Sequence, residues 1–143
     1  MKLSAKAEYA CLAVLELALR HHRPQPARLT EIAGSNGIPE RFLVQILLQL
    51  KGAGLVTSVR GASGGYRLAY DPREISVWDV VQTVEGPPVA SVAEESCGHG
   101  VGWHVLHDVW VESNRLEREH LEEINFAQLA ESARGQNSNM YYI

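Results

Sequence analysis

Basic and glycine residues gather in one short segment, where they could bind a polyanion. Residues 55–69 read Leu-Val-Thr-Ser-Val-Arg-Gly-Ala-Ser-Gly-Gly-Tyr-Arg-Leu-Ala, with a β-prone run on each side of a glycine-rich tip. Such a tip needs the backbone freedom of glycine, so we expect a β-hairpin here. Arg60 and Arg67 stand on either side of the tip, as in the wing of a winged helix-turn-helix. The segment therefore indicates DNA as a partner.

A second pair of polar residues lies on the helix expected just before this hairpin, over residues 39–52. Its expected core face has apolar residues at i, i+3, i+4 and i+7, namely Leu43, Ile46, Leu47 and Leu50. Arg41 and Gln45 then project from the opposite face, and both side-chain types hydrogen-bond base edges in the major groove. Taken alone, they could be ordinary solvated residues of a surface helix. The preceding short helix, the Ser-Asn-Gly turn and the basic hairpin favour DNA recognition instead.

The order of these elements predicts a mainly α protein with a small β-hairpin. Helices are expected over residues 4–20, 30–34, 39–52, 75–84, 104–124 and 126–133. The predicted organisation is a winged helix-turn-helix DNA-binding domain over 1–86, a sensor-type loop over 87–103, a dimerisation helix and short terminal helix over 104–134, and a flexible tail over 135–143.

The long helix expected from His104 to Ile124 carries an apolar stripe that a small domain cannot cover by itself. The stripe consists of Leu106, Val109, Trp110, Ser113, Leu116, His120, Leu121 and Ile124. A homodimer would cover this face, and two-fold symmetric DNA-binding proteins commonly pair in this way.

Composition limits the remaining function classes. Residues 1–75 hold 10 Lys and Arg against 6 Asp and Glu, whereas residues 76–143 hold 3 against 11. A basic first half and an acidic second half suggest two tasks, one of which faces a polyanion. No apolar run is long enough to cross a membrane, and two distant cysteines make no disulfide framework. We therefore expect a cytoplasmic protein with no membrane partner.

At this point the chain resembles the bacterial winged-helix regulators that include the iron–sulfur cluster regulator IscR, the nitric-oxide-sensing repressor NsrR and the cysteine-metabolism repressor CymR. The resemblance covers residues 1 to about 133 and rests on the Met-Lys-Leu-Ser opening, the wing, the Ile-Ser-Val-Trp-Asp-Val segment and the His-Asp-Val-Trp segment. It implies a homodimer, a palindromic double-stranded DNA operator and transcriptional control, usually repression. The predicted DNA-binding residues are Thr30, Glu40, Arg41, Gln45, Arg60, Gly61, Ser63, Gly64 and Gly65.

The resemblance also suggests an iron–sulfur cluster, because many of these regulators bind one through three cysteines before the long helix. His107 matches a histidine found there in some members, and His104 occupies the position of the third cysteine. Cys97 lies about one residue from the middle position, and the first position has no cysteine. In several relatives the first helix of the other protomer supplies a fourth ligand, at the position held here by Glu8.

The complete three-cysteine pattern is therefore absent. A smaller metal or cluster site remains chemically possible from Cys97, His104 and His107, with His99 and the other protomer's Glu8 or Cys11 as further candidates.

Three alternatives remain open. The first is a cluster-free regulator that responds to a small molecule or protein partner. The second is a winged-helix module that contacts protein instead of DNA. The third is an enzyme with Cys97 as nucleophile and His104 or His107 as base. No oxyanion or substrate-pocket motif accompanies that cysteine, so the chain is not expected to be an enzyme.

Overall fold

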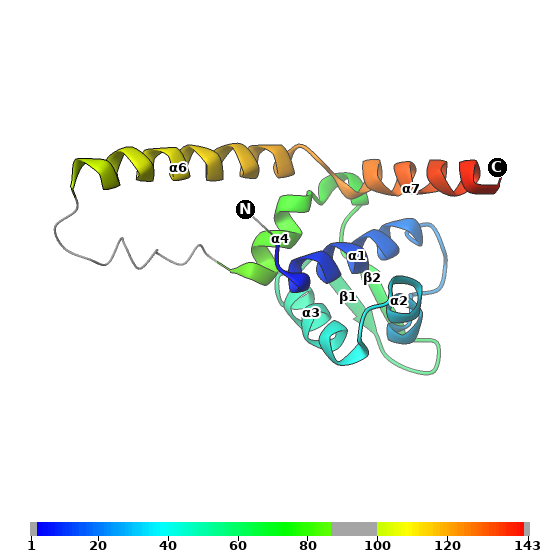
Figure 1. Ribbon diagram of the computed structural model, residues 1–143. Coiled ribbons are helices and arrows are strands. Elements are labelled where there is room, and N and C mark those ends of the chain that lie inside the picture. The colour runs from blue at the N-terminus through cyan, green and yellow to red at the C-terminus, as the bar shows by residue number, and fades with distance from the viewer. Residues whose placement is uncertain (1–2, 87–99, 142–143) are drawn as a thin grey trace.

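The computed structural model describes residues 3–86 and 100–141, with side chains described up to residue 137 (Figure 1). In chain order the elements are α1 (Ala5–Leu19), α2 (Leu29–Asn36), α3 (Glu40–Gly52), β1 (Val56–Val59), β2 (Gly65–Leu68), the short 3-10 helix η1 (Pro72–Glu74), α4 (Val77–Glu85), α6 (Val101–Glu122) and α7 (Phe126–Tyr141).

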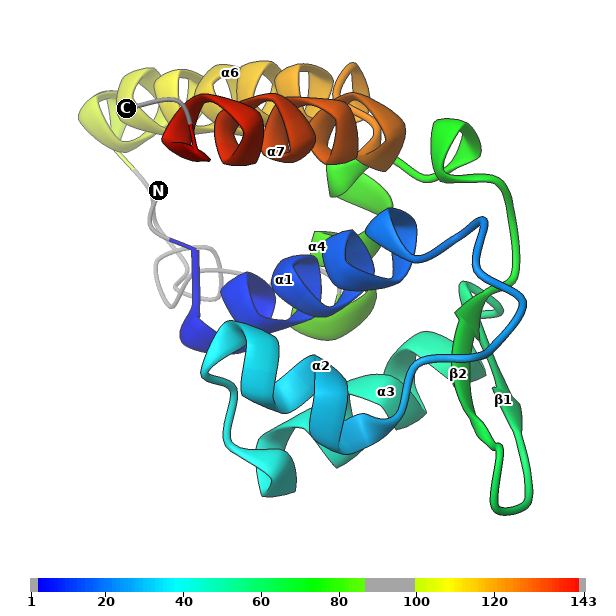
Figure 2. The same cartoon turned by 90° about the vertical axis from the view of Figure 1, so that its right-hand side faces the viewer.

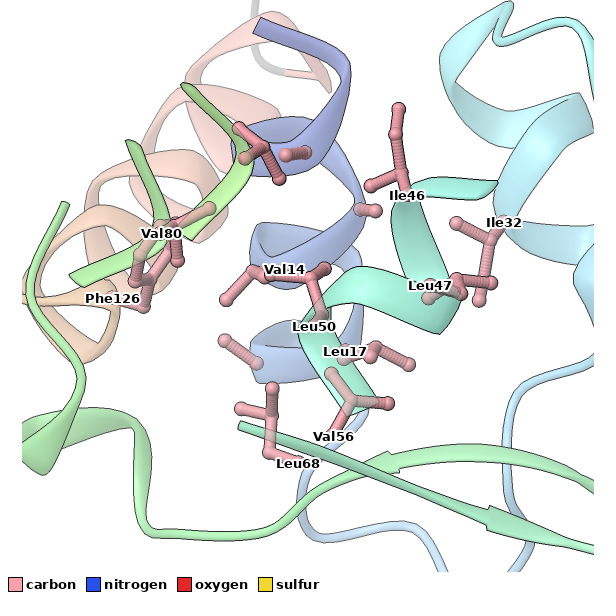
Figure 3. Packing of buried hydrophobic residues seen from close by; sticks show 14 of the residues in the cluster. Val14, Leu17, Ile32, Ile46, Leu47, Leu50, Val56, Leu68, Val80 and Phe126 are labelled. Carbon is pink, nitrogen blue, oxygen red and sulfur yellow. The ribbon is translucent and has the colours of Figure 1, made fainter. Parts of the chain in front are cut away.

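Helix α1 lies at the centre and contacts α2, α3, α4 and α7. The Ser4 hydroxyl caps it by accepting a hydrogen bond from the Ala7 N–H at 3.1 Å. Its buried residues are mostly small, which lets neighbouring helices approach closely: Ala7, Ala10, Ala13, Val14, Leu17 and Ala18. Larger side chains from α3, the hairpin and α7 complete one continuous core around this helix (Figure 3).

Helices α2 and α3 form the predicted helix-turn-helix. Gly37 ends α2 with φ 63°, a left-handed conformation that glycine adopts without strain. The Ile38 N–H then bonds the Ala33 carbonyl at 3.0 Å, which closes the turn. Helix α2 is longer than the predicted 30–34, because Asn36 continues the helix and its side-chain amide donates to the Ile32 carbonyl at 2.9 Å.

The hairpin is an antiparallel pair in which Val56 faces Leu68 and Val59 faces Gly65. A third segment joins it, because Ala27 and Tyr66 exchange backbone hydrogen bonds of 3.0 and 2.7 Å. The loop before α2 is thereby fixed to the wing. Val56 and Leu68 both point into the core (Figure 3).

Helix α4 begins at Val77, two residues later than predicted. Ser76 and Asp79 form a reciprocal capping box that sets this start, and η1 occupies the chain just before it. The corner between α6 and α7 is tied to the start of α4, because the Val77 N–H bonds the Ile124 carbonyl at 2.9 Å and the Phe126 N–H bonds the Ile75 carbonyl at 3.0 Å.

The C-terminal helices differ from the prediction in their ends. Helix α6 begins at Val101 and ends at Glu122, so it starts three residues before the predicted 104–124. Helix α7 continues to Tyr141, beyond its predicted end at residue 133, while the flexibility of residues 135–143 stays a prediction. Phe126 and Ala130 are buried and fix the first turns of α7, from which the helix can propagate cheaply.

Helices α6 and α7 lie on one side of the α1 and α4 layer, whereas α2, α3 and the tip of the hairpin lie on the other (Figures 1 and 2). The helix-turn-helix and the long helix α6 therefore occupy opposite sides of the molecule. Among the described residues, no helix is both long and apolar enough to cross a membrane.

Candidate nucleic-acid interface

The outward face of α3 presents the two residues predicted to read bases. The predicted core residues Leu43, Ile46, Leu47 and Leu50 are all buried. Arg41 and Gln45 lie on the opposite face and are exposed. The predicted orientation of this helix is therefore confirmed, while the contact of Arg41 and Gln45 with DNA stays a prediction.

The Arg41 guanidinium lies over the ring of the next residue, Phe42. It lies 4.9 Å from the centre of the Phe42 ring, within the range of a cation–π contact. Phe42 is itself 48% exposed, so the pair stands on the surface at the start of α3. A cation–π contact uses the face of the guanidinium and none of its N–H groups, which suits a residue that must donate to a base edge.

The wing tip requires glycine for a steric reason that the sequence did not reveal. A Cβ on Gly64 would lie 2.2 Å from the Val59 carbonyl oxygen, and one on Gly65 would lie 2.3 Å from the Ala27 carbonyl oxygen. Gly61 has φ 108°, a conformation that other residues rarely adopt. Internal packing thus requires glycine at positions 64 and 65, and backbone conformation favours it at position 61. The predicted contact of these glycines with DNA stays a prediction.

The two wing arginines have different roles. Arg67 is half-buried and donates to two carbonyls of the loop before α2, at 3.0 Å for that of Arg23 and also to that of Pro24. Arg60 is exposed and makes no hydrogen bond or ion pair with any residue in 3–86 or 100–141. Of the pair noted in the sequence, Arg60 is thus the one that can contact a phosphate.

Arg28 is a candidate that sequence reasoning missed. Its Nη2 donates to the Ala62 carbonyl at the wing tip over 2.9 Å, while its backbone forms the N-cap of α2. At the other end of the interface, Lys51 Nζ donates to the Ser58 hydroxyl over 2.7 Å. These two bonds join the helix-turn-helix to the wing, so the two DNA-facing parts are held as one unit. A basic residue directly before a helix start was the only available signal for Arg28.

The other predicted DNA-binding residues cluster around the same surface. Thr30 lies in the first turn of α2, Glu40 starts α3, and Ser63 lies at the wing tip; all three are exposed. The structure thus brings the predicted set together around α2, α3 and the hairpin.

The second predicted site, for a metal or cluster, is only partly described. Cys97 and His99 lie outside the described residues. His104 and His107 lie at the start of α6 beside Trp103, whose ring stacks on His107 with a 4.4 Å centroid distance and meets His104 edge-on at 5.1 Å. Their spacing of three residues places both imidazoles on one side of the helix.

Of the two first-helix candidates, Cys11 is the less suited to bind a metal. Glu8 is exposed on α1. Cys11 is half-buried and packs against the core, and burial, with a smaller effect of the Glu85 carboxylate, raises the pKa of its thiol to about 11. A raised pKa disfavours the thiolate that metals require.

The donor set of the described residues does not fit an iron–sulfur cluster. Such clusters are held by cysteine thiolates, and Cys11 is the one cysteine within 3–86 and 100–141. In these two ranges no group of three or more His, Cys, Asp and Glu side chains is arranged to hold a metal ion.

A helix-turn-helix followed by a basic hairpin, with exposed polar residues on the second helix, defines a winged-helix DNA-binding protein. A family model described as "Rrf2: Iron-dependent Transcriptional regulator" matches residues 3–132. The chain belongs to the Rrf2 family of DNA-binding transcriptional regulators, and it is not an enzyme. The resemblance noted from the sequence is thereby confirmed.

Individual relatives agree with this assignment. The chain is 47% identical over 87 residues to an rrf2-like HTH-type transcriptional regulator of Rhodobacter capsulatus, a match that covers 59% of this chain and 58% of that protein. It is 34% identical to the HTH-type transcriptional regulator CymR of Bacillus subtilis, over the full length of both. Among solved structures it resembles T. potens IscR, with a TM-score of 0.78 and 34% identity, covering 93% of this chain and 88% of that one.

Proposed function

We propose that two copies of this chain form a homodimer that binds a palindromic operator in the cytoplasm and represses transcription. The main support for the dimer is the exposure of α6, since none of its 22 residues is buried. The large apolar side chains exposed along it are Val101, Val105, Leu106, Val109, Trp110, Val111 and Leu116. A helix with this much apolar surface needs a partner, and a second copy offers the same surface in return.

The position of α6 supports a dimer that can bind DNA. Because α6 lies on the side opposite α3 and the wing tip, pairing through α6 leaves both helix-turn-helix units uncovered (Figure 2). Helix α6 also carries five of the 11 acidic residues of the second half of the chain, and these would repel phosphates. Their distance from α3 keeps that repulsion away from the proposed DNA face.

Each part of the DNA face has a distinct role in this proposal. Arg41 and Gln45 enter the major groove and donate or accept at base edges, which supplies sequence recognition. Arg60 and the wing backbone approach phosphates or the minor groove, which supplies affinity. Two-fold symmetry of the dimer then requires two inverted half-sites.

The decisive experiment combines DNA selection with sedimentation. The full-length protein is used to select duplexes from a random pool, and the recovered sites are sequenced and tested by gel shift. We expect a palindromic site and a stable dimer at micromolar concentration. Recovery of no enriched sequence, together with failure to retard genomic promoter fragments, would reject DNA recognition. A well-folded monomer that binds a single half-site would reject the dimer alone.

The regulatory signal is proposed to act at the start of α6, through Cys97 with His104 and His107. Because the sequence lacks the complete three-cysteine pattern, the chemistry we propose is a bound metal ion or oxidation of the Cys97 thiol. Peroxide would convert the thiolate to a sulfenic acid and be reduced to hydroxide. A change at this end of α6 could tilt the helix and alter the spacing of the two α3 helices.

This regulatory proposal has its own test. Metal content and visible absorbance are measured on anaerobically purified protein, and operator affinity is compared for the parent and Cys97→Ala before and after peroxide. We expect metal or peroxide to change the operator affinity of the parent and to leave that of Cys97→Ala unchanged. Equal affinity under all conditions, with no bound metal and no visible absorbance, would favour a cluster-free regulator that responds to a small molecule or protein partner.

A further inference from the structure

Two branched apolar side chains lie exposed within the outward face of α3, where polar groups would be expected. Leu48 is 57% exposed and Val44 is 36% exposed. They are four residues apart, so they stand next to each other on successive turns of the helix. The apolar residues that pack this helix onto the rest of the molecule lie on its other side. Neither residue belongs to the buried core cluster.

Charge at both ends of this apolar pair indicates what covers it. Arg41 lies three residues before Val44, and Lys51 lies three residues after Leu48, so a cation stands one turn beyond each end. The wing adds Arg60 on the same side of the molecule. Two apolar side chains flanked by cations are suited to contact a polyanion that also presents apolar groups. It would oppose the docking of a purely apolar surface, because the cations would lose their hydration.

The floor of the DNA major groove matches this description. Its base edges carry hydrogen-bond donors and acceptors, and its one apolar group is the 5-methyl of thymine. We propose that Leu48 and Val44 contact thymine methyl groups in each operator half-site, which makes them specificity determinants beside Arg41 and Gln45. This proposal rests on the proposed DNA recognition by α3. The operator would then carry thymine at the positions that face these two side chains.

Replacement of thymine by deoxyuridine tests the contact directly. The exchange removes the methyl group and leaves the base pair and the O4 acceptor unchanged. In a duplex selected by the protein, each thymine is replaced in turn, at symmetric positions of both half-sites, and affinity is measured by gel shift. Loss of one buried methyl is expected to weaken binding about fourfold per half-site, or roughly 15-fold for the symmetric pair.

The same duplexes are then measured with Leu48→Ala and with Gln49→Ala as a matched control. Gln49 is also exposed but lies about 100° further round the helix. We expect Leu48→Ala to bind the thymine duplex more weakly and to show no further loss at the deoxyuridine position that affects the parent. Gln49→Ala should keep the parent's full sensitivity to deoxyuridine. Leu48→Met, which keeps an apolar side chain of similar volume, should restore most of that sensitivity.

Other results would overturn the proposal. One is a parent that binds every deoxyuridine duplex as tightly as the thymine duplex. Another is a Leu48→Ala protein whose affinity falls by the same factor on the thymine duplex and on the deoxyuridine duplex. That result would assign Leu48 to packing or to a protein partner. Thermal unfolding of each variant shows whether the fold is intact. Failure of the parent to select any duplex would instead reject the proposed function itself, so the two failures are distinguishable.

Discussion

Arg28 and Ala62 are 34 residues apart in the chain, yet the guanidinium of the first donates to the backbone carbonyl of the second over 2.9 Å. This bond links the N-terminus of α2 to the tip of the wing. The wing is a two-stranded hairpin whose tip projects away from the core (Figure 2). A two-stranded hairpin is marginally stable by itself, so a tether at its tip limits its motion relative to α3.

Arg28→Ala should therefore weaken operator binding by about 1 kcal/mol, because the wing must be ordered when DNA binds. Arg28→Lys keeps the positive charge but not the planar donor geometry, so it separates the tether from a direct phosphate contact. Gel shift with the selected duplex gives the affinity. If Arg28→Lys binds as tightly as the parent while Arg28→Ala does not, charge and not the tether carries the effect.

Arg41→Ala should cost about 1–3 kcal/mol at the selected operator and much less on unrelated DNA, because a base contact is specific to sequence. The measurement is the ratio of the two affinities, from competition gel shifts. An equal loss on both duplexes would place Arg41 on the phosphates.

Arg60→Ala should weaken binding to all duplexes alike and reduce the slope of log affinity against log salt by about 1, because a phosphate contact releases counterions. Fluorescence anisotropy between roughly 50 and 200 mM salt measures that slope. A slope equal to the parent's would contradict the role of Arg60.

Gly65→Ala should destabilise the fold by about 1–3 kcal/mol, because its Cβ would lie 2.3 Å from the Ala27 carbonyl oxygen and break the bridge to Tyr66. Gly34→Ala is the matched control. It lies within α2, where a Cβ meets nothing within 4 Å and alanine favours the helix. Urea denaturation should show a loss for the first variant and no loss, or a small gain, for the second.

Leu116→Glu should dissociate the proposed dimer, because burial of an unpaired charge in an apolar interface is strongly unfavourable. Leu116 is 53% exposed in the single chain, so the substitution should leave the fold of each copy intact. Sedimentation and circular dichroism measure the two properties, with Asn114→Asp, at an exposed polar position nearby, as a control. A Leu116→Glu protein that remains a dimer would place the interface elsewhere.

Because of Cys11, the free energy of unfolding should fall as pH rises in the alkaline range. Burial raises the pKa of its thiol from 9.0 to about 11, so the folded state holds its proton where the unfolded state releases it. Its contribution is complete below pH 9 and is lost as pH rises from about 9 to about 11, by about 2 kcal/mol. Because other groups titrate there too, the measurement is the difference in urea stability between the parent and Cys11→Ala. A difference that is independent of pH between 8 and 11 would contradict the raised pKa.

Local sequence determined the helix-turn-helix and the wing. The apolar spacing of Leu43, Ile46, Leu47 and Leu50 is complete within one helix, so it fixed which side of α3 is buried without any knowledge of the partner elements. The glycines of the wing tip likewise indicated a hairpin, because the conformations that a tight tip requires exclude most other residues. The basic residues of α3 and the acidic residues of α6 lie on opposite sides of the molecule (Figure 2).

Tertiary structure alone decided which wing arginine is available to contact a phosphate and which residues hold the wing in place. Arg67 is bound to carbonyls more than 40 residues earlier in the chain, and Arg28 to one 34 residues later. The length of α7 was decided in the same way, since Phe126 and Ala130 fix its start by packing into a core built from distant elements. The predicted helix ended at residue 133 because local sequence gives only a weak helix preference, which a buried anchor at one end of the helix outweighs.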